Sequence, residues 1–197
     1  PSVPYPISSG ERDKILSISP EQMRSLTAKQ LKNWTPAQVA ALSFGGVDLI
    51  VNNAGLSISK TIEDHTEKDW DLLYDVLVKG QFMVTQAATK VMKKQDIGGD
   101  VINIVSKNAL VSGPNNAGYG SAKAAQLHLS RLNAAELGAA GIRVNVVNPD
   151  AVISDSNIWA GGWAEGRAKA YGITVDELPA YYAKRTLLNK IILPVDI

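Results

Sequence analysis

The chain has 197 residues, 45% of them hydrophobic, and its 20 basic and 19 acidic side chains give a net charge of +1. This balance, without a basic block, argues against nucleic acid or an anionic membrane as a partner. There is no cysteine, which excludes disulfides and cysteine-based metal sites, and the two histidines, His65 and His128, lie too far apart to predict a zinc site. No apolar run is long enough to span a bilayer and no signal pattern opens the chain, so we expect a cytoplasmic protein.

Residues 1–45 contain a repeat of eight residues, with the units SPEQMRSL, TAKQLKNW and TPAQVAAL at 19–26, 27–34 and 35–42. Each unit begins with Ser or Thr, has Gln three residues later and carries apolar residues at its fifth and eighth places. Ser/Thr-x-x-Gln is a capping box, so each unit predicts a short helix start. Such helices are too short to be stable alone. We expect a helical packing element or linker, with a docking or oligomerisation arm as the alternative.

From residue 46 onward the pattern predicts strands that alternate with long helices. VDLIVNNAG indicates a strand buried on both faces, and the other expected elements are strands at 98–106 and 141–152 and helices over 67–95 and 115–138. Alternation of this kind is typical of a parallel sheet flanked by helices. The fold class is therefore α/β and Rossmann-like, with three clear strands and hence an incomplete sheet. We divide the chain into a helical repeat segment, 1–45, and a partial Rossmann-like domain, 46–197.

Polar residues follow all three predicted strands. They are Asn53-Ala54-Gly55, Ser106 and Asn148-Pro149-Asp150. In open parallel sheets ligands bind beyond the carboxyl ends of the strands. The helix that carries Tyr119 and Lys123 begins at the same edge, and a spacing of four residues places both side chains on one helical face. An ammonium near a phenol lowers the phenol pKa, so we expect Tyr119 to exchange a proton near neutral pH. The YxxxK pattern alone is common in helices.

Four features in the right order resemble the short-chain dehydrogenase/reductase family: NNAG, a serine thirteen residues before a tyrosine, YxxxK, and a proline after the third strand. The resemblance covers roughly residues 46–197. Three stretches of sequence carry a narrower similarity: IVSKNALVSGPNNAGYGSAKAAQLHLSR, IRVNVVNPDAV and YGITVDELPAYYAKRTLL. These stretches are similar to the dehydrogenase half of bifunctional rhamnulose-phosphate aldolase/alcohol (lactaldehyde) dehydrogenases. The metal site of the aldolase half would need more histidines than this chain has.

The resemblance implies an oxidoreductase that transfers hydride between a nicotinamide cofactor and a small hydroxy or carbonyl compound, a lactaldehyde-like product of deoxy-sugar breakdown being one candidate. Tyr119 would be the acid/base, Lys123 would lower the tyrosine pKa and hold the nicotinamide ribose, and Ser106 would orient the substrate oxygen. General acid–base catalysis contributes about 10²–10⁴ in rate. The cofactor would be NAD or NADP, with NAD favoured by the resemblance.

The resemblance also implies the other cofactor contacts and the assembly. Asn53, Ala54 and Gly55 would approach the adenosine side of the cofactor. Pro149, Val152 and Ser154 match the loop that meets its carboxamide end. In this family the two long helices often pair with their copies in a second subunit, so we expect a homo-oligomer.

Further side chains have two interpretations each. Lys107 and Asn108 are rim residues or substrate contacts, and Trp159 and Trp163 either shape a pocket or pack under a lid. Three arginines could either lie on the solvated surface or bind an anionic group of the substrate, and the surface is the simpler interpretation: Arg143, Arg167 and Arg185. The position of His128, on the opposite side of the helix from Tyr119, predicts a structural role.

The sequence departs from the family pattern in three places. There is no TGxxxGxG turn, and the strand bearing the acidic residue that grips the adenosine ribose is missing too. Leu77 stands where the family often has a catalytic asparagine, and the sequence ends at Leu-Pro-Val-Asp-Ile, before the last strand of the family sheet. A second hypothesis therefore stays open, in which the chain is a truncated or spliced relative that serves as a non-catalytic scaffold or interaction module.

Overall fold

A computed structural model describes residues 46–152 and 162–197 of the chain. The repeat segment 1–45, Ser154 and Trp159 lie outside the described residues, so the division at residue 45 stays a prediction. The described part contains three strands, β1 (Leu49–Asn52), β2 (Gly99–Ile104) and β3 (Ile142–Val147). They form one parallel sheet in the order β1-β2-β3. The Rossmann-like α/β fold class is thus confirmed, because a helical crossover joins each pair of neighbouring strands.

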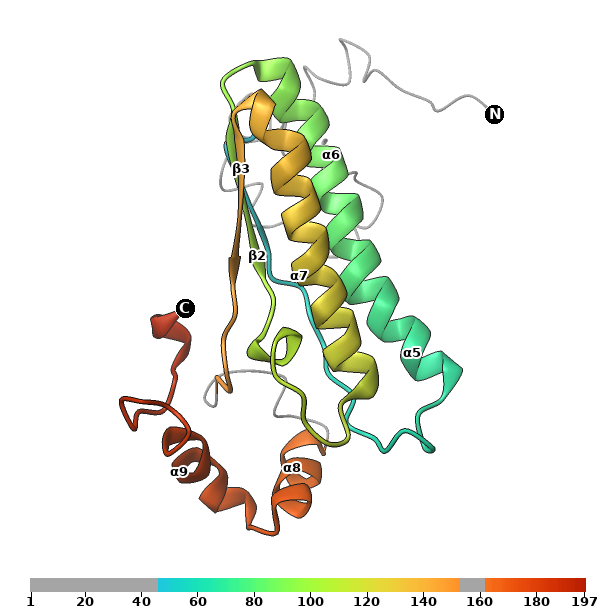
Figure 1. Cartoon of the computed structure of the whole chain (residues 1–197), viewed down its shortest axis with the longest axis vertical. Coiled ribbons are helices and arrows are strands. Elements are labelled where there is room, and N and C mark those ends of the chain that lie inside the picture. Colours follow the sequence, from blue (N-terminus) through green and yellow to red (C-terminus); the bar gives the residue numbers. More distant parts are fainter. Residues whose placement is uncertain (1–45, 153–161) are drawn as a thin grey trace, which may run out of the picture.

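Long helices cover one face of this sheet (Figure 1). The helix expected over 67–95 consists of α5 (Glu67–Leu73), a π-helical segment (Tyr74–Lys79) and α6 (Gly80–Gln95), and the second helix is α7 (Ala117–Leu137). Short 3₁₀ turns lie at Lys107–Ala109, Gly138–Ala140, Val175–Glu177 and Pro194–Asp196. Helices α8 (Trp163–Tyr171) and α9 (Leu178–Ala183) lie beyond the carboxyl ends of the strands (Figure 1). In the described part of the chain, no helix has the length and apolar character needed to cross a bilayer.

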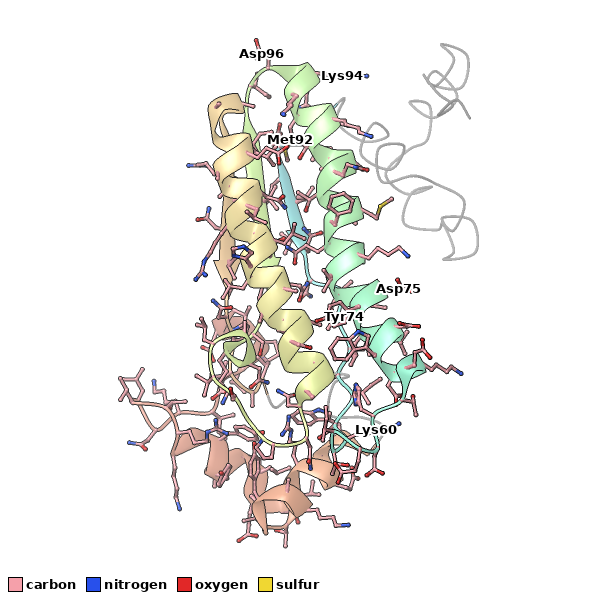
Figure 2. All side chains as sticks on the ribbon, turned by 45° about the vertical axis from the view of Figure 1, so that its right-hand side comes forward. Lys60, Tyr74, Asp75, Met92, Lys94 and Asp96 are labelled. Atoms are coloured by element: carbon pink, nitrogen blue, oxygen red, sulfur yellow. The ribbon has the colours of Figure 1, made fainter. Side chains whose placement is uncertain are left out.

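The main apolar core lies between the sheet and these helices. Its buried members are Val47, Ala88, Met92, Val101, Leu137 and Ile142. Met92 points from α6 toward the sheet, whereas Lys94 on the same helix points away from it (Figure 2). A smaller cluster nearer the carboxyl ends of the strands contains Leu73, Leu77, Tyr119 and Ala122.

The prediction that the first strand is buried on both faces is wrong. In β1 the side chains of Leu49 and Val51 are 52% and 53% exposed. Both lie on the face of the sheet that α6 and α7 do not cover, and burial alternates along the strand accordingly. The apolar run therefore predicted the strand correctly, but it did not predict that one face of the strand is exposed.

A buried polar layer connects the sheet to the helices. Asn103 of β2 is fully buried, accepts a hydrogen bond from Asn52 Nδ2 (2.7 Å) and donates one from its Nδ2 to Ser130 Oγ (2.8 Å). Ser130 in turn donates to the Gln126 carbonyl (2.7 Å), and Gln81 donates to Ser130 Oγ (3.2 Å). Because buried polar groups are costly when unpaired, this layer fixes how α6 and α7 sit on the strands.

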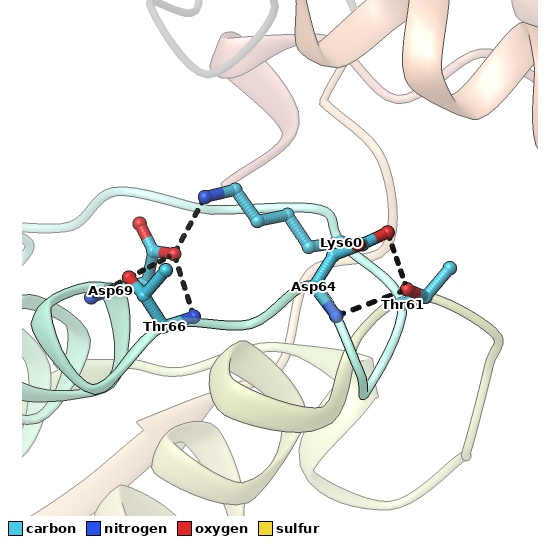
Figure 3. Close-up of polar contacts among 5 residues, drawn as sticks. All are labelled: Lys60, Thr61, Asp64, Thr66 and Asp69. Carbon is cyan, nitrogen blue, oxygen red and sulfur yellow. Dashed lines mark hydrogen bonds and ion pairs between the residues drawn. The ribbon is translucent and has the colours of Figure 1, made fainter.

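Hydrogen bonds hold the second half of the loop between β1 and α5 against the start of α5 and the start of α7. Thr66 caps α5 by accepting from the Asp69 N–H (3.1 Å), and the Asp69 carboxylate accepts from the Thr66 N–H (3.0 Å) and from Lys60 Nζ (2.6 Å), as Figure 3 shows. The hydrogen bond from Lys60 holds the pKa of Asp69 well below its usual range. Lys60 also pairs with Asn116 through a β-bridge, so this loop lies beside the start of α7.

Candidate active site

A cavity of about 670 Å³ lies where the carboxyl ends of the strands meet α7, α8 and α9. It is lined by residues from separate stretches of the chain, among them Ser106 after β2, Tyr119 and Lys123 on α7, and Pro149 and Asp150 after β3. The side chains that the sequence pattern singled out on these elements therefore face one space. Its volume is in the range of pockets that hold small molecules and cofactors.

Tyr119 and Ser106 lie close together at the cavity wall. Tyr119 lies in the first turn of α7 and is 8% exposed, while Ser106 lies two residues beyond the end of β2 and is 7% exposed. The Ser106 side chain is near enough to act on the Tyr119 phenol, whose pKa it lowers against the effect of burial. Ser106 Oγ also accepts a hydrogen bond from the Asn108 N–H (3.1 Å), which starts the 3₁₀ turn after the strand. The serine is thus held in place by its own loop, on the same cavity wall as the phenol.

Lys123 lies one helical turn beyond Tyr119 on the same face of α7. Its Nζ is 5.7 Å from the centre of the Tyr119 ring and donates a hydrogen bond to the Ile104 carbonyl (3.1 Å). The side chain is 4% exposed, and burial lowers the pKa of Lys123 to about 8. A lysine in this state is close to its titration point in neutral to mildly alkaline solution.

The expectation that the pKa of Tyr119 is lowered is wrong for the protein without ligands. Burial raises the pKa of Tyr119, because the phenolate is poorly solvated in the cavity wall. The hydrogen bond with Ser106 and the positive charge of Arg167 act in the opposite direction without reversing the rise. Tyr119 is therefore a neutral phenol at neutral pH.

Most of the residues expected at the cofactor lie at the cavity. Asn53, Gly55, Pro149 and Val152 line it together with Tyr119 and Lys123. Ala54 is exposed and is not among the lining residues, and Ser154 lies outside the described residues. The buried Oδ1 of Asn116, another lining residue, has no hydrogen-bond partner and so offers an acceptor to a ligand. These residues could hold a cofactor, with Asn53 and Gly55 expected on its adenosine side and Pro149 and Val152 at its carboxamide end, and these roles stay predictions.

Leu77 presents no polar group where an asparagine was expected. Its side chain is fully buried against Leu73 and Tyr119, within the π-helical segment. Its carbonyl accepts a hydrogen bond from Gln126 Nε2 (2.7 Å), so Gln126 supplies the polar contact at this turn.

The largest surprise among the arginines is Arg167. The simpler interpretation placed it in solvent, yet it is 4% exposed and lines the cavity, because α8 packs against the loop before α7. Arg185 is exposed and lines the cavity as well, whereas Arg143 forms an ion pair with Asp100 (2.7 Å) away from it. His128 is exposed on α7 and is not a lining residue.

For other lining residues, the sequence supported two alternative interpretations or none. Trp163 faces the cavity and donates from Nε1 to Ser57 Oγ (3.0 Å), and Lys107 pairs with Asp150 (3.3 Å). Asn108 is also a lining residue. Ser57, Asn116, Tyr171 and Tyr182 line the cavity without having been predicted, and only the aromatic-rich YGITVDELPAYY hinted at the last two. The described residues hold no group of His, Cys, Asp or Glu that could bind a metal ion.

A protein-family model described as short chain dehydrogenase matches residues 23–160. The chain belongs to the short-chain dehydrogenase family. The match begins within the segment that carries the eight-residue repeat. The order of strands and the cavity at their carboxyl ends agree with a nucleotide-binding fold of this family.

Relatives in this family are named as oxidoreductases and dehydrogenases. The chain is 48% identical over 158 residues to the uncharacterized oxidoreductase YuxG of Bacillus subtilis (strain 168), covering 80% of this chain and 23% of YuxG. Sorbitol-6-phosphate 2-dehydrogenase SrlD from Erwinia amylovora has a similar structure (TM-score 0.74, 27% identity, 80% of this chain and 60% of that one). So does a gluconate 5-dehydrogenase from Burkholderia cenocepacia J2315 in complex with NADP and tartrate (TM-score 0.66, 26% identity, 82% and 60%).

Proposed function

We propose that this chain carries the catalytic half of an NAD(P)-dependent oxidoreductase that interconverts a small hydroxy compound and its carbonyl form. The observation that supports this most is that Ser106 and Tyr119 lie close together, with Lys123 one turn away, at the wall of one cavity. A phenol, an alcohol and an amine in this arrangement can hold and protonate a carbonyl oxygen. The chain spans 23% of YuxG and 60% of each structural neighbour, so the activity of the whole protein is part of this proposal.

Each group has a distinct role in the proposed reaction. A bound nicotinamide supplies or accepts the hydride. In the reductive direction the Tyr119 hydroxyl donates its proton to the carbonyl oxygen as that oxygen becomes an alkoxide, and in the oxidative direction the phenolate takes the proton back. Ser106 donates a hydrogen bond that holds the same oxygen beside the phenol. The Lys123 ammonium stabilises the phenolate left behind and holds the ribose hydroxyls of the cofactor.

We further propose that the substrate derives from a sugar, with lactaldehyde among the compounds to test and NAD the preferred cofactor. The matched 158 residues are 23% of YuxG, which supports a relationship to longer proteins with a dehydrogenase part. One structural neighbour is named for a sugar-alcohol phosphate and another was solved with NADP. NADP is therefore the alternative that the assay has to include.

Cofactor binding and a single-atom variant test the proposal. The purified chain is titrated with NADH and with NADPH while the nicotinamide fluorescence is recorded, and turnover is assayed with small hydroxy and carbonyl compounds. Tyr119→Phe removes only the hydroxyl, so we expect it to abolish turnover and to keep cofactor binding. Tyr74→Phe, in a stacked pair with Trp70, is the matched control and keeps turnover. Absence of a saturable cofactor signal would support the non-catalytic scaffold instead.

We also propose a homo-oligomer. Apolar side chains are exposed on α5 and α6, including Trp70 (40%), Leu72 (47%), Phe82 (44%) and Met83 (51%). Several large apolar side chains exposed on neighbouring helical segments would suit an interface between subunits. Light scattering after size exclusion measures the mass, and we expect Phe82→Glu to yield monomers. An unchanged mass for that variant, or a monomeric wild type, would contradict this proposal.

A further inference from the structure

Arg167 is a buried cation whose hydrogen-bonding capacity is only partly used. It lies on α8, is 4% exposed and lines the cavity. One terminal nitrogen donates to the Pro114 carbonyl (3.0 Å), whereas the buried Nε has no hydrogen-bond partner. Within the described residues, 46–152 and 162–197, no carboxylate lies within ion-pair distance of Arg167.

A guanidinium in this position is costly for the folded state unless a counter-charge reaches it. Removing a charged side chain from water costs several kcal/mol, which an ion pair or a full set of hydrogen bonds normally offsets. The ring of Trp163 lies 5.2 Å from the Arg167 guanidinium, a cation–π contact that stabilises the charge only in part. The fold therefore places a cation with spare donor capacity at a cavity wall.

Among the described residues that line the cavity, positively charged side chains outnumber carboxylate side chains. Its charged lining side chains are Lys107, Lys123, Arg167, Arg185 and Asp150. The only carboxylate side chain among them is already paired with Lys107 at 3.3 Å. The positive charge of Arg167 also acts to lower the pKa of three lining tyrosines: burial outweighs it in Tyr119 and Tyr182, whose pKa is raised, whereas the pKa of Tyr171 is lowered. The guanidinium thus acts on the same space as the Tyr119 hydroxyl.

We propose that the substrate carries a carboxylate or phosphate group and that Arg167 binds it. This inference rests on the proposed function, because it places the reacting oxygen at Tyr119 and the anionic group at Arg167. The planar guanidinium donates two parallel hydrogen bonds to either type of anion, which Lys cannot reproduce. A phosphate of the cofactor is the competing occupant.

Binding of matched small ligands to the full chain tests the proposal without requiring turnover. L-lactate, glycerol 3-phosphate and the neutral propane-1,2-diol are titrated by calorimetry, with and without NAD. We expect saturable binding of at least one anion and affinity for the diol at least about tenfold weaker, the size of one lost charge-assisted hydrogen bond or more. The tighter anion identifies the substrate group as carboxylate or phosphate.

Two variants and a control locate the site. Arg167→Gln is expected to weaken anion binding about tenfold or more while leaving NADH affinity unchanged, and Arg167→Lys, which keeps the charge, to retain part of it. Arg143→Gln, at an exposed ion pair away from the cavity, leaves both unchanged. Circular dichroism reports whether each variant folds, and the ligand comparison on the wild type does not depend on the variants.

Equal affinity for lactate, glycerol phosphate and diol would overturn the proposal, as would a loss of NADH affinity rather than anion affinity in Arg167→Gln. Failure of NADH to bind the wild type would count against the proposed function, not against an anion site.

Discussion

Replacing Lys123 by Met should stabilise the protein at neutral pH, although it removes a residue proposed to act in catalysis. Burial lowers the pKa of Lys123 from its ordinary value of 10.5 to about 8. At about 1.4 kcal/mol for each factor of ten in the ionisation equilibrium, carrying the charged amine in the fold costs about 3 kcal/mol at pH 7. Met keeps the aliphatic chain and loses the hydrogen bond to the Ile104 carbonyl, worth about 1 kcal/mol. We expect a net gain of about 2 kcal/mol.

The pH dependence separates protonation from packing. The folded pKa lies below the unfolded one, so the cost is complete below pH 8, falls as the pH rises toward 10.5 and vanishes above that. Urea unfolding of the wild type and of Lys123→Met at pH 7 and pH 10 gives the difference in unfolding free energy at each pH. The advantage of the variant should shrink by about 2–3 kcal/mol between the two conditions. The hydrogen bond cancels in this comparison, because a neutral amine also donates it.

Lys90→Met is the control for this experiment. Lys90 lies on α6 and is exposed, so its replacement should change the free energy of unfolding by the same small amount at both pH values. The reasoning would be refuted if Lys123→Met differed from the wild type equally at pH 7 and pH 10. That result would mean that the Lys123 amine is as well solvated in the folded protein as in the unfolded chain.

Three further substitutions test the scaffold by urea unfolding. Gly98→Ala should destabilise by about 2 kcal/mol or more, because Gly98 has φ +78° and an added Cβ would lie 2.5 Å from the Gly141 carbonyl oxygen; a neutral effect would contradict that geometry. Asn103→Ala should cost about 2 kcal/mol by removing two buried hydrogen bonds, from Asn52 Nδ2 and to Ser130 Oγ, and a loss below about 1 kcal/mol would mean that water replaces the Asn103 side chain. Asp69→Asn should weaken the protein at pH 6 and clearly less at pH 2, since stability from a lowered carboxyl pKa is present above the unfolded pKa and is lost as the pH falls toward the folded one; equal losses at both pH values would exclude this.

The sequence predicted the centre of the site because the parallel topology leaves little choice. A residue just beyond the end of a strand, such as Ser106, must lie at the carboxyl edge of the sheet, and a helix that packs back on that sheet starts at the same edge. The spacing of Tyr119 and Lys123 then places both side chains on the buried face of α7. Local pattern and topology therefore sufficed for these three residues.

Burial and electrostatics could not be predicted in the same way, because they depend on what each side chain packs against. The apolar β1 side chains Leu49 and Val51 have the same appearance in sequence whether or not a layer covers them. Asn103 looks like an exposed interruption of an apolar strand until Ser130 is placed opposite it. Arg167 becomes part of the cavity only because α8, far away in sequence, returns to the Pro114 loop.

The same dependence on packing explains why the proposed proton donor has its pKa raised and its neighbouring amine has its pKa lowered. Burial disfavours charge on both Tyr119 and Lys123, so an unliganded cavity holds a neutral phenol beside an amine near its titration point. At neutral pH this pair is protonated, which is the state needed to deliver a proton to a carbonyl oxygen. Oxidation of an alcohol needs the phenolate, whose formation the positive charge of Arg167 favours against burial. If the proposed chemistry is right, alkaline pH favours oxidation and neutral pH favours reduction, and the balance is set by how deeply α7 buries the two side chains.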